Sequence, residues 1–258
     1  MEWAYAFSGL VVGFIVGLTG VGAGALMTPL LVLVFGVPPA VAVGTDLLYA
    51  SITKGAGAWV HARRGNVDWG LVCWLAAGSV PAALLTLAVL KTLDVGSRQF
   101  SVLVTTALGG ALVLTALSLV FKERLRFGRS RAGDAPTRAG GFRISATVAT
   151  GAALGALVTL TSVGAGALGM VALIALYPRL PAATLVGSDI AHAVPLTLVA
   201  GLGYAALGNV DFHLLASLLA GSLPGIYLGS HAAGRMPERA LRYVLAAVLF
   251  LIGGKLVW

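Results

Sequence analysis

The segment that decides the fold reads GLTGVGAGALMTPLL and covers residues 17–31. It interrupts an apolar stretch, 4–35, that would otherwise be interpreted as one continuous helix. Within it, glycine alternates with valine and alanine over residues 20–24, and Pro29 follows. Glycine destabilises a helix interior by about 1 kcal/mol relative to alanine, and proline by about 3 kcal/mol. The segment therefore predicts a helix break near its centre and a second helix beyond it.

The composition identifies the environment of this break. The chain has 258 residues, of which 59% are hydrophobic and only 10% are charged, and its mean hydropathy is +0.97. Soluble domains carry about 25% charged residues. The long apolar stretches therefore indicate an all-α polytopic membrane protein, because a helix satisfies its own backbone in lipid.

The formal net charge of +8 does not indicate a nucleic-acid-binding protein. Seven of the 17 Lys and Arg residues fall in one stretch, 122–143. A cytoplasmic loop that faces anionic lipid explains this cluster better, so we exclude nucleic acid as a partner. The single cysteine, Cys73, has no disulfide or metal-binding partner, and we interpret it as a small core residue. We expect neither a metal site nor a cofactor.

Eight apolar stretches follow one another along the chain. One membrane crossing needs about 20 residues. Two stretches, 4–35 and 144–177, are too long for one ordinary crossing. The six that fit a single crossing are 40–60, 69–90, 99–121, 182–206, 212–230 and 240–258.

The chain contains the same unit twice, and each long stretch opens one copy. The sequence VGAGAL at 21–26 recurs at 163–168. We therefore predict a first membrane repeat at 1–121, a basic linker at 122–143 and a second membrane repeat at 144–258. Four further blocks recur in order, at 39–40 and 181–182, 43–46 and 186–189, 65–68 and 208–211, and 78–81 and 221–224.

Each long stretch is either a re-entrant hairpin or a single kinked span. The arms of the first, about 4–18 and 25–35, are too short to cross a core of about 30 Å at 1.5 Å per residue. Charge favours the hairpin, because the chain then returns to the side of the basic linker. That topology places four more arginines in the cytoplasm and gives the two repeats opposite orientations. These arginines are Arg179, Arg235, Arg239 and Arg242.

These motifs resemble a known family. GVGAGALMTPLL at 20–31, VPPAVAVGTDLL at 37–48 and HARRGNVDW at 61–69, with a second diverged copy, are similar to the TauE/SafE sulfite exporters. The resemblance covers nearly the whole chain outside the linker. It implies a transporter of sulfur-containing anions, such as sulfite and organosulfonates, in the bacterial inner membrane. Members differ in cargo, so the resemblance does not assign the substrate.

Two half-helices that begin near the membrane midplane would form an anion site. Their first N–H groups lack intrahelical partners, and the positive end of each helix dipole faces the ligand. Thr19, Thr28 and Thr161 add hydroxyl groups beside the breaks. Alternatively, the glycines only permit close helix packing. The predicted substrate-binding residues are Gly20, Val21, Gly22, Ala23, Gly24, Thr45, Lys54, Ser162, Val163, Gly164, Ala165, Gly166 and Ser188.

Lys54 is the only Lys or Arg well inside a predicted span. It lies eight residues after Asp46, two helical turns further on, and therefore on roughly the same helix face. It would neutralise the substrate or pair with Asp189. The alternative is that it extends its side chain to the membrane surface.

Asp46 and Asp189 occupy equivalent positions in the two repeats, and His192 lies one turn after Asp189. Ionisable groups within a membrane are costly and usually functional. We interpret Asp46, Asp189 and His192 as proton-coupling residues, since a carboxylate beside an anion has to be protonated to avoid repulsion. The alternative is that they form structural hydrogen bonds or ion pairs.

We therefore expect a secondary transporter, not an enzyme, that exports sulfite or an organosulfonate by alternating access between two inverted repeats. Its expected partners are the small anion, protons and the lipid bilayer, with a homodimer left open. The alternatives are an uptake permease or channel-like uniporter for another anion, and, from other classes, a membrane scaffold or an intramembrane enzyme.

Overall fold

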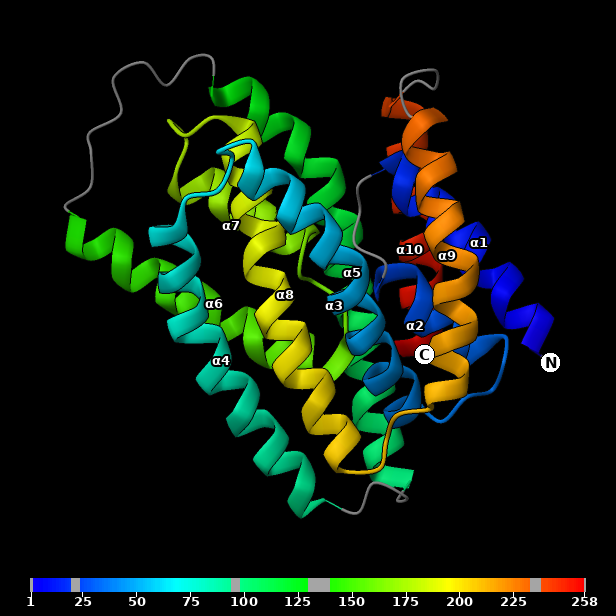
Figure 1. Cartoon of the computed structure of the whole chain (residues 1–258). Helices are drawn as coiled ribbons and strands as arrows, with labels where there is room; N and C mark the ends of the chain where they lie inside the picture. The colour runs from blue at the N-terminus through cyan, green and yellow to red at the C-terminus, as the bar shows by residue number, and fades with distance from the viewer. Residues whose placement is uncertain (1, 20–23, 94–97, 130–139, 233–237, 258) are drawn as a thin grey trace.

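The computed structural model describes residues 2–19, 24–93, 98–129, 140–232 and 238–257. These residues form helices and no strand, as the composition predicts for this class (Figure 1). The helices are α1 (Glu2–Thr19), α2 (Gly24–Leu33), α3 (Pro39–Arg63), α4 (Trp69–Thr92), α5 (Arg98–Arg129), α6 (Gly140–Thr161), α7 (Ala167–Leu176), α8 (Ala182–Ala206), α9 (Phe212–Ala232) and α10 (Glu238–Val257).

The second predicted helix break is confirmed and separates α6 from α7, whereas the first is predicted between the end of α1 at Thr19 and the start of α2 at Gly24. In the second break, Gly164 and Gly166 have φ angles of 116° and 129°, which glycine adopts without the steric cost of a β-carbon. The same break places Ser162 at φ 59°, a left-handed conformation that is uncommon for a residue other than glycine. The tip of the first break, 20–23, lies outside the described residues.

Among the described residues, five helices are long and apolar enough to cross a membrane. One of them is Gly141–Thr161, which reaches this length because α6 begins within the predicted basic linker. The helix α3 is longer still, with 25 residues, but carries Asp46 and Lys54. Besides Gly141–Thr161, the helices of membrane-spanning length and hydropathy are Trp69–Thr92, Arg98–Phe121, Ala182–Ala206 and Phe212–Ala232.

Glycines allow two pairs of parallel helices to pack backbone against backbone. Gly13 of α1 contacts Ser222 of α9, and one turn later Gly17 contacts Ile226. On the other side of the molecule, Gly151 and Gly155 of α6 contact Leu75 and Ser79 of α4 in the same order. Small residues spaced by four permit this close approach between membrane helices.

The helices α3 and α8 pack against each other in opposite directions. Gly44, near the start of α3, contacts Tyr204 near the end of α8, whereas Gly187, near the start of α8, contacts His61 near the end of α3. These two helices occupy equivalent places in the two sequence repeats, and they are antiparallel.

The remaining contacts divide the helices into two directional sets. The start of α4 contacts the start of α8, and their ends also meet, where Gly203 abuts Leu87. Helix α3 is parallel to α9, since Thr45 contacts Asp211 and Tyr49 faces Ser222. Thus α1, α3 and α9 run one way, while α4, α6 and α8 run the other way (Figure 1). Because α1 and α3 point in the same direction, the chain between them has to return, and α2 lies in that returning section.

The duplicated sequence blocks pair crosswise between the two halves. Thr45 of the first half accepts the N–H of Asp211 at 3.1 Å, and Ser188 of the second half accepts the N–H of Asp68 at 2.9 Å. The Asp211 side chain caps α9 by accepting the N–H of Leu214, and the Asp68 side chain caps α4 by accepting the N–H of Leu71. The recurrence of these blocks therefore reflects one interface made twice.

The hydrophobic core joins the halves rather than separating them. One cluster combines Val43 and Leu47 of α3 with Leu196 and Tyr204 of α8. Cys73, in contrast, is exposed on α4, so its interpretation as a core residue was wrong. In a membrane protein the lipid-facing and core-facing positions are both apolar, and an apolar run does not distinguish them.

Candidate functional site

The start of α2 meets the second helix break in the interior of the molecule. Gly24 begins α2 and lies directly against the carbonyl oxygen of Ser162, in the second break, so that a β-carbon at residue 24 would overlap that oxygen. A cavity of about 10 Å³ lies at this junction, room for about one water molecule. Its lining comes from three segments: Gly24 and Ala25 of α2, Thr115 of α5, and Ser162, Gly164, Ala165 and Ala167.

Asp46 lies beside this junction and is fully buried. Its Oδ2 atom accepts the hydroxyl of Thr28 at 2.5 Å, and the same oxygen borders Gly24. Its Oδ1 atom is buried without a hydrogen-bond partner in the described part of the chain. A buried carboxylate with one free oxygen retains capacity to bind a proton or a donor group.

Lys54 joins the two repeats at the same place. Its Nζ atom donates to the carbonyl oxygen of Ala165, in the second break, at 2.7 Å. Asp46 and Asp189 are the acidic groups that act electrostatically on its ammonium. The side chain thus extends inward to the second break, and the interpretation that it extends to the membrane surface does not describe this structure.

Asp189 and His192 occupy the buried face of α8. Asp189 packs against Gly169 of α7, where a β-carbon would overlap its carboxylate. His192 bonds to the hydroxyl of Ser79 through Nε2 at 2.8 Å. In the first repeat Tyr49 takes the place of His192 and faces Ser222, the counterpart of Ser79.

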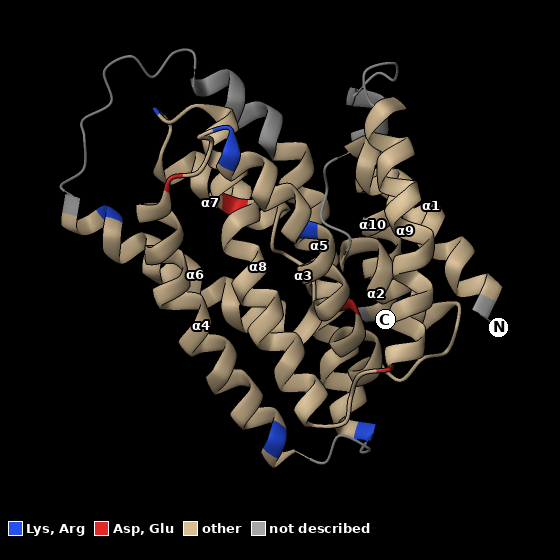
Figure 2. Ribbon diagram, in the orientation of Figure 1, with Lys and Arg blue, Asp and Glu red and all other residues tan. Residues whose placement is uncertain are grey.

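In the described parts of α3 and α8, charge away from the helix ends is confined to three of these groups. Figure 2 shows most of the coloured Lys, Arg, Asp and Glu positions at helix ends, with few along α3 and α8. Away from the ends of these two helices, the charged residues are Asp46, Lys54 and Asp189. Because lipid and protein interior both penalise isolated charge, their proximity to the two helix breaks marks this region as the candidate site.

The structure brings together part of the predicted set. Gly24, Lys54, Ser162, Gly164 and Ala165 meet at the junction, and Gly166 caps the start of α7. The N–H of Val163 donates to Thr161 within the break. The predicted contacts of Gly20, Val21, Gly22 and Ala23 lie outside the described residues.

Thr45 and Ser188 do not line the cavity. Each hydroxyl instead accepts a hydrogen bond from a backbone N–H of the other repeat. We expect Ser188→Ala to leave the partly buried N–H of Asp68 unpaired and to destabilise the protein by about 1–3 kcal/mol. Thermal unfolding of the purified protein measures this cost. Ser145→Ala is the control, since that exposed hydroxyl bonds only within its own helix. Weaker anion binding at unchanged stability would instead support the predicted substrate contact.

Sequence reasoning missed Thr115 and Ser79. Thr115 lies in an apolar span with no motif around it, and nothing in its sequence context distinguishes it from a packing residue. Ser79 belongs to the duplicated block 78–81, so its recurrence was a usable signal.

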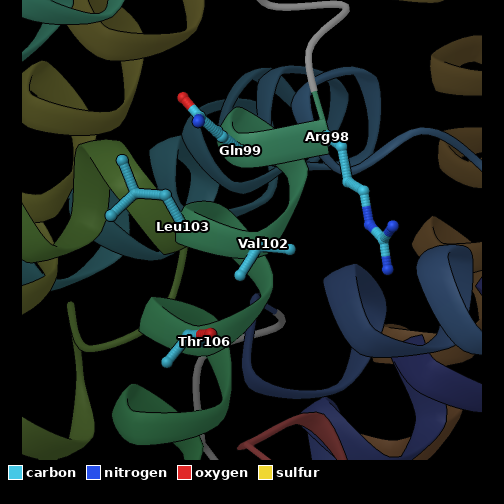
Figure 3. Close-up of a pocket in the computed structure, with 5 residues that line it drawn as sticks. All are labelled: Arg98, Gln99, Val102, Leu103 and Thr106. Atoms are coloured by element: carbon cyan, nitrogen blue, oxygen red, sulfur yellow. The ribbon is translucent and has the colours of Figure 1, made fainter.

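A larger hollow of about 540 Å³ lies on the outer surface of α5 (Figure 3). Its lining residues are exposed, and three of them, Val102, Leu103 and Thr106, project from the outer face of α5. Arg98 and Gln99 lie at its end. This hollow contains none of the buried charges, so we do not include it in the site.

Comparison with known proteins identifies the family of this chain. The sequence model described as Sulfite exporter TauE/SafE matches residues 5–256. The chain belongs to the TauE/SafE family. It is 40% identical to the probable membrane transporter protein YjnA of Bacillus subtilis (strain 168), over the full length of both chains.

Further relatives carry the same description. YunE of the same organism, also a probable membrane transporter protein, is 39% identical over 97% of this chain and 95% of its own. YdhB is 29% identical over 93% of this chain and 92% of its own. No solved structure matches. These findings identify a multi-pass membrane transporter of the TauE/SafE family and confirm the resemblance seen in the sequence.

Proposed function

We propose that this protein is a secondary transporter that exports a small sulfur-containing anion, sulfite or an organosulfonate, and couples that export to protons. One observation carries the proposal. The first turns of two short helices, α2 and α7, line one buried cavity, and the Lys54 ammonium bonds to its rim at Ala165. Two helix N-termini and a cation provide a positive potential that stabilises an anion.

Alternating access would occur between two inverted repeats, 1–121 and 144–258. The antiparallel α3 and α8, and the crosswise bonds of Thr45 and Ser188, support this arrangement. The cavity of about 10 Å³ is smaller than a sulfite ion, so substrate entry requires the two repeats to move apart. The bond from Lys54 to Ala165 would then open, and its ammonium would turn to the anion.

The membrane would be the bacterial inner membrane, with linker 122–143 in the cytoplasm. Parallel α3 and α9 support this topology, because Arg63 at the end of α3 and His231 at the end of α9 lie at the same end of the molecule. Basic residues on that side satisfy the positive-inside rule.

Protons would bind Asp46, Asp189 and His192. The free Oδ1 atom of Asp46 supports a role as proton acceptor beside the anion. The bond between His192 and Ser79 supports a link from α8 to α4, which lie in different repeats.

The test is flux in liposomes that contain the purified protein. We expect sulfite efflux to accelerate when a pH gradient is imposed, and Asp46→Asn to remove that acceleration. Asp211→Asn is the matched control, because asparagine caps a helix as well as aspartate does. Flux that ignores the gradient would reject proton coupling. If neither sulfite nor an organosulfonate moves, export of this class of anion is rejected.

A further inference from the structure

Thr115 uses its hydroxyl differently from other threonines in the helices. Thr86, Thr105, Thr150, Thr159 and Thr197 each donate to a carbonyl oxygen one turn earlier in their own helix, at 2.7–2.8 Å. This bond is the usual way to satisfy a threonine in a membrane helix. The Thr115 hydroxyl is buried and makes no hydrogen bond within the described residues, and the residue is only 1% exposed.

A second hydroxyl at the same cavity also makes no hydrogen bond of regular geometry in the described segments. The Ser162 Oγ atom is buried, the residue is 5% exposed, and Asp46 is the acidic group that its side chain faces. Both residues line the cavity between the two helix breaks. A buried polar atom without a partner costs about 1–3 kcal/mol, so two such atoms at one cavity call for a ligand.

The helix α5 packs against α2 and α7. Ala111 and Leu112, one turn before Thr115, belong to the same hydrophobic cluster as Ala25 of α2 and Ala167 of α7. Helix α5 therefore presents Thr115 to the junction on a rigid scaffold. Helix α5 thus forms a third wall of the cavity, besides the start of α2 and the second break.

We propose that Thr115 and Ser162 bind one oxygen atom of the transported oxyanion, an inference that rests on the proposed function. Each hydroxyl donates one hydrogen bond to that oxygen, and the first-turn N–H groups of α2 and α7 add the positive ends of two helix dipoles. The cavity of this structure has room for about one oxygen atom.

The experiment measures how strongly sulfite, methanesulfonate and chloride stabilise the purified full-length protein against heat. A ligand that binds the native state raises its unfolding temperature by mass action. The variants are Thr115→Val, which keeps the volume and removes the hydroxyl, and Thr115→Ser, which keeps the hydroxyl. Ser118→Ala is the control on the same helix, because its buried hydroxyl already donates to the Thr115 carbonyl at 2.7 Å.

We expect Thr115→Val to weaken binding of the oxyanions about tenfold or more, since it removes a hydrogen bond to a charged group. Its unfolding temperature without ligand should equal or exceed that of the wild type, because an unpartnered buried hydroxyl is gone. Thr115→Ser and Ser118→Ala should bind like the wild type.

Two results would overturn this assignment. The first is unchanged oxyanion affinity in Thr115→Val, and the second is an equal loss in Ser118→Ala. If no anion stabilises the wild-type protein, the proposed function itself fails, and this result is distinct from the other two.

Discussion

Lys54→Met is expected to reduce sulfite flux by about a hundredfold or more, the largest functional effect of any single change in this protein. The ammonium bonds to Ala165, and it is also the positive charge that acts on Asp46 and Asp189. Removing one partner from a buried charged group costs about 3–5 kcal/mol, because the remaining charge loses its compensation. Flux in liposomes at matched protein content measures the loss.

Two further variants separate a transport role from a folding role. Lys91→Met removes an exposed lysine at the end of α4 and should leave flux unchanged. The double variant Lys54→Met/Asp189→Asn removes both a cation and an anion, so it should regain thermal stability without regaining flux. If the double variant transports sulfite normally, Lys54 serves only to neutralise Asp189, and its role at the substrate is rejected.

Gly44→Ala is expected to destabilise the protein by about 1–3 kcal/mol or more, by overpacking a backbone contact. A β-carbon there would overlap the Asn209 carbonyl and lie 2.8 Å from the Tyr204 side chain. The carbonyl belongs to a helix-capping turn and cannot move without breaking the cap. Thermal unfolding and the yield of monodisperse protein in detergent measure the effect.

The second repeat provides an internal check on this result. Gly187 makes the equivalent contact with the Asn66 carbonyl, so Gly187→Ala should cost about as much as Gly44→Ala. Gly55→Ala is the matched control on α3, since no atom lies within 4 Å of its added carbon. If Gly44→Ala is as stable as Gly55→Ala, the crosswise contact between the repeats is not present in solution.

Several features followed from the sequence because they depend on local chemistry. The helical class follows from composition, and the breaks follow from glycines at 20–24 and 164–166, since backbone preference is a property of the residue. The caps at Asp68 and Asp211 were also predictable, because a cap bonds to N–H groups three residues away. The family was recognisable from the same motifs.

The duplicated blocks were visible in the sequence, but their meaning was not. Thr45 and Ser188, which follow the repeated Gly44 and Gly187, were predicted to bind the substrate. In the structure each of these pairs packs against the capping turn of the opposite half, as an interface would. Sequence similarity shows that two segments are equivalent, yet it does not show which segment each one contacts.

Composition, helix breaks, caps and duplication were thus determined by the sequence alone, because each depends on residues close together in the chain. Only the tertiary structure decided which groups share the buried site. Lys54 and Ala165 are 111 residues apart, and the bond between them depends on how α3 packs against the second break. Thr115 likewise lies at that site because α5 packs against α2 and α7, and such contacts do not depend on distance along the chain.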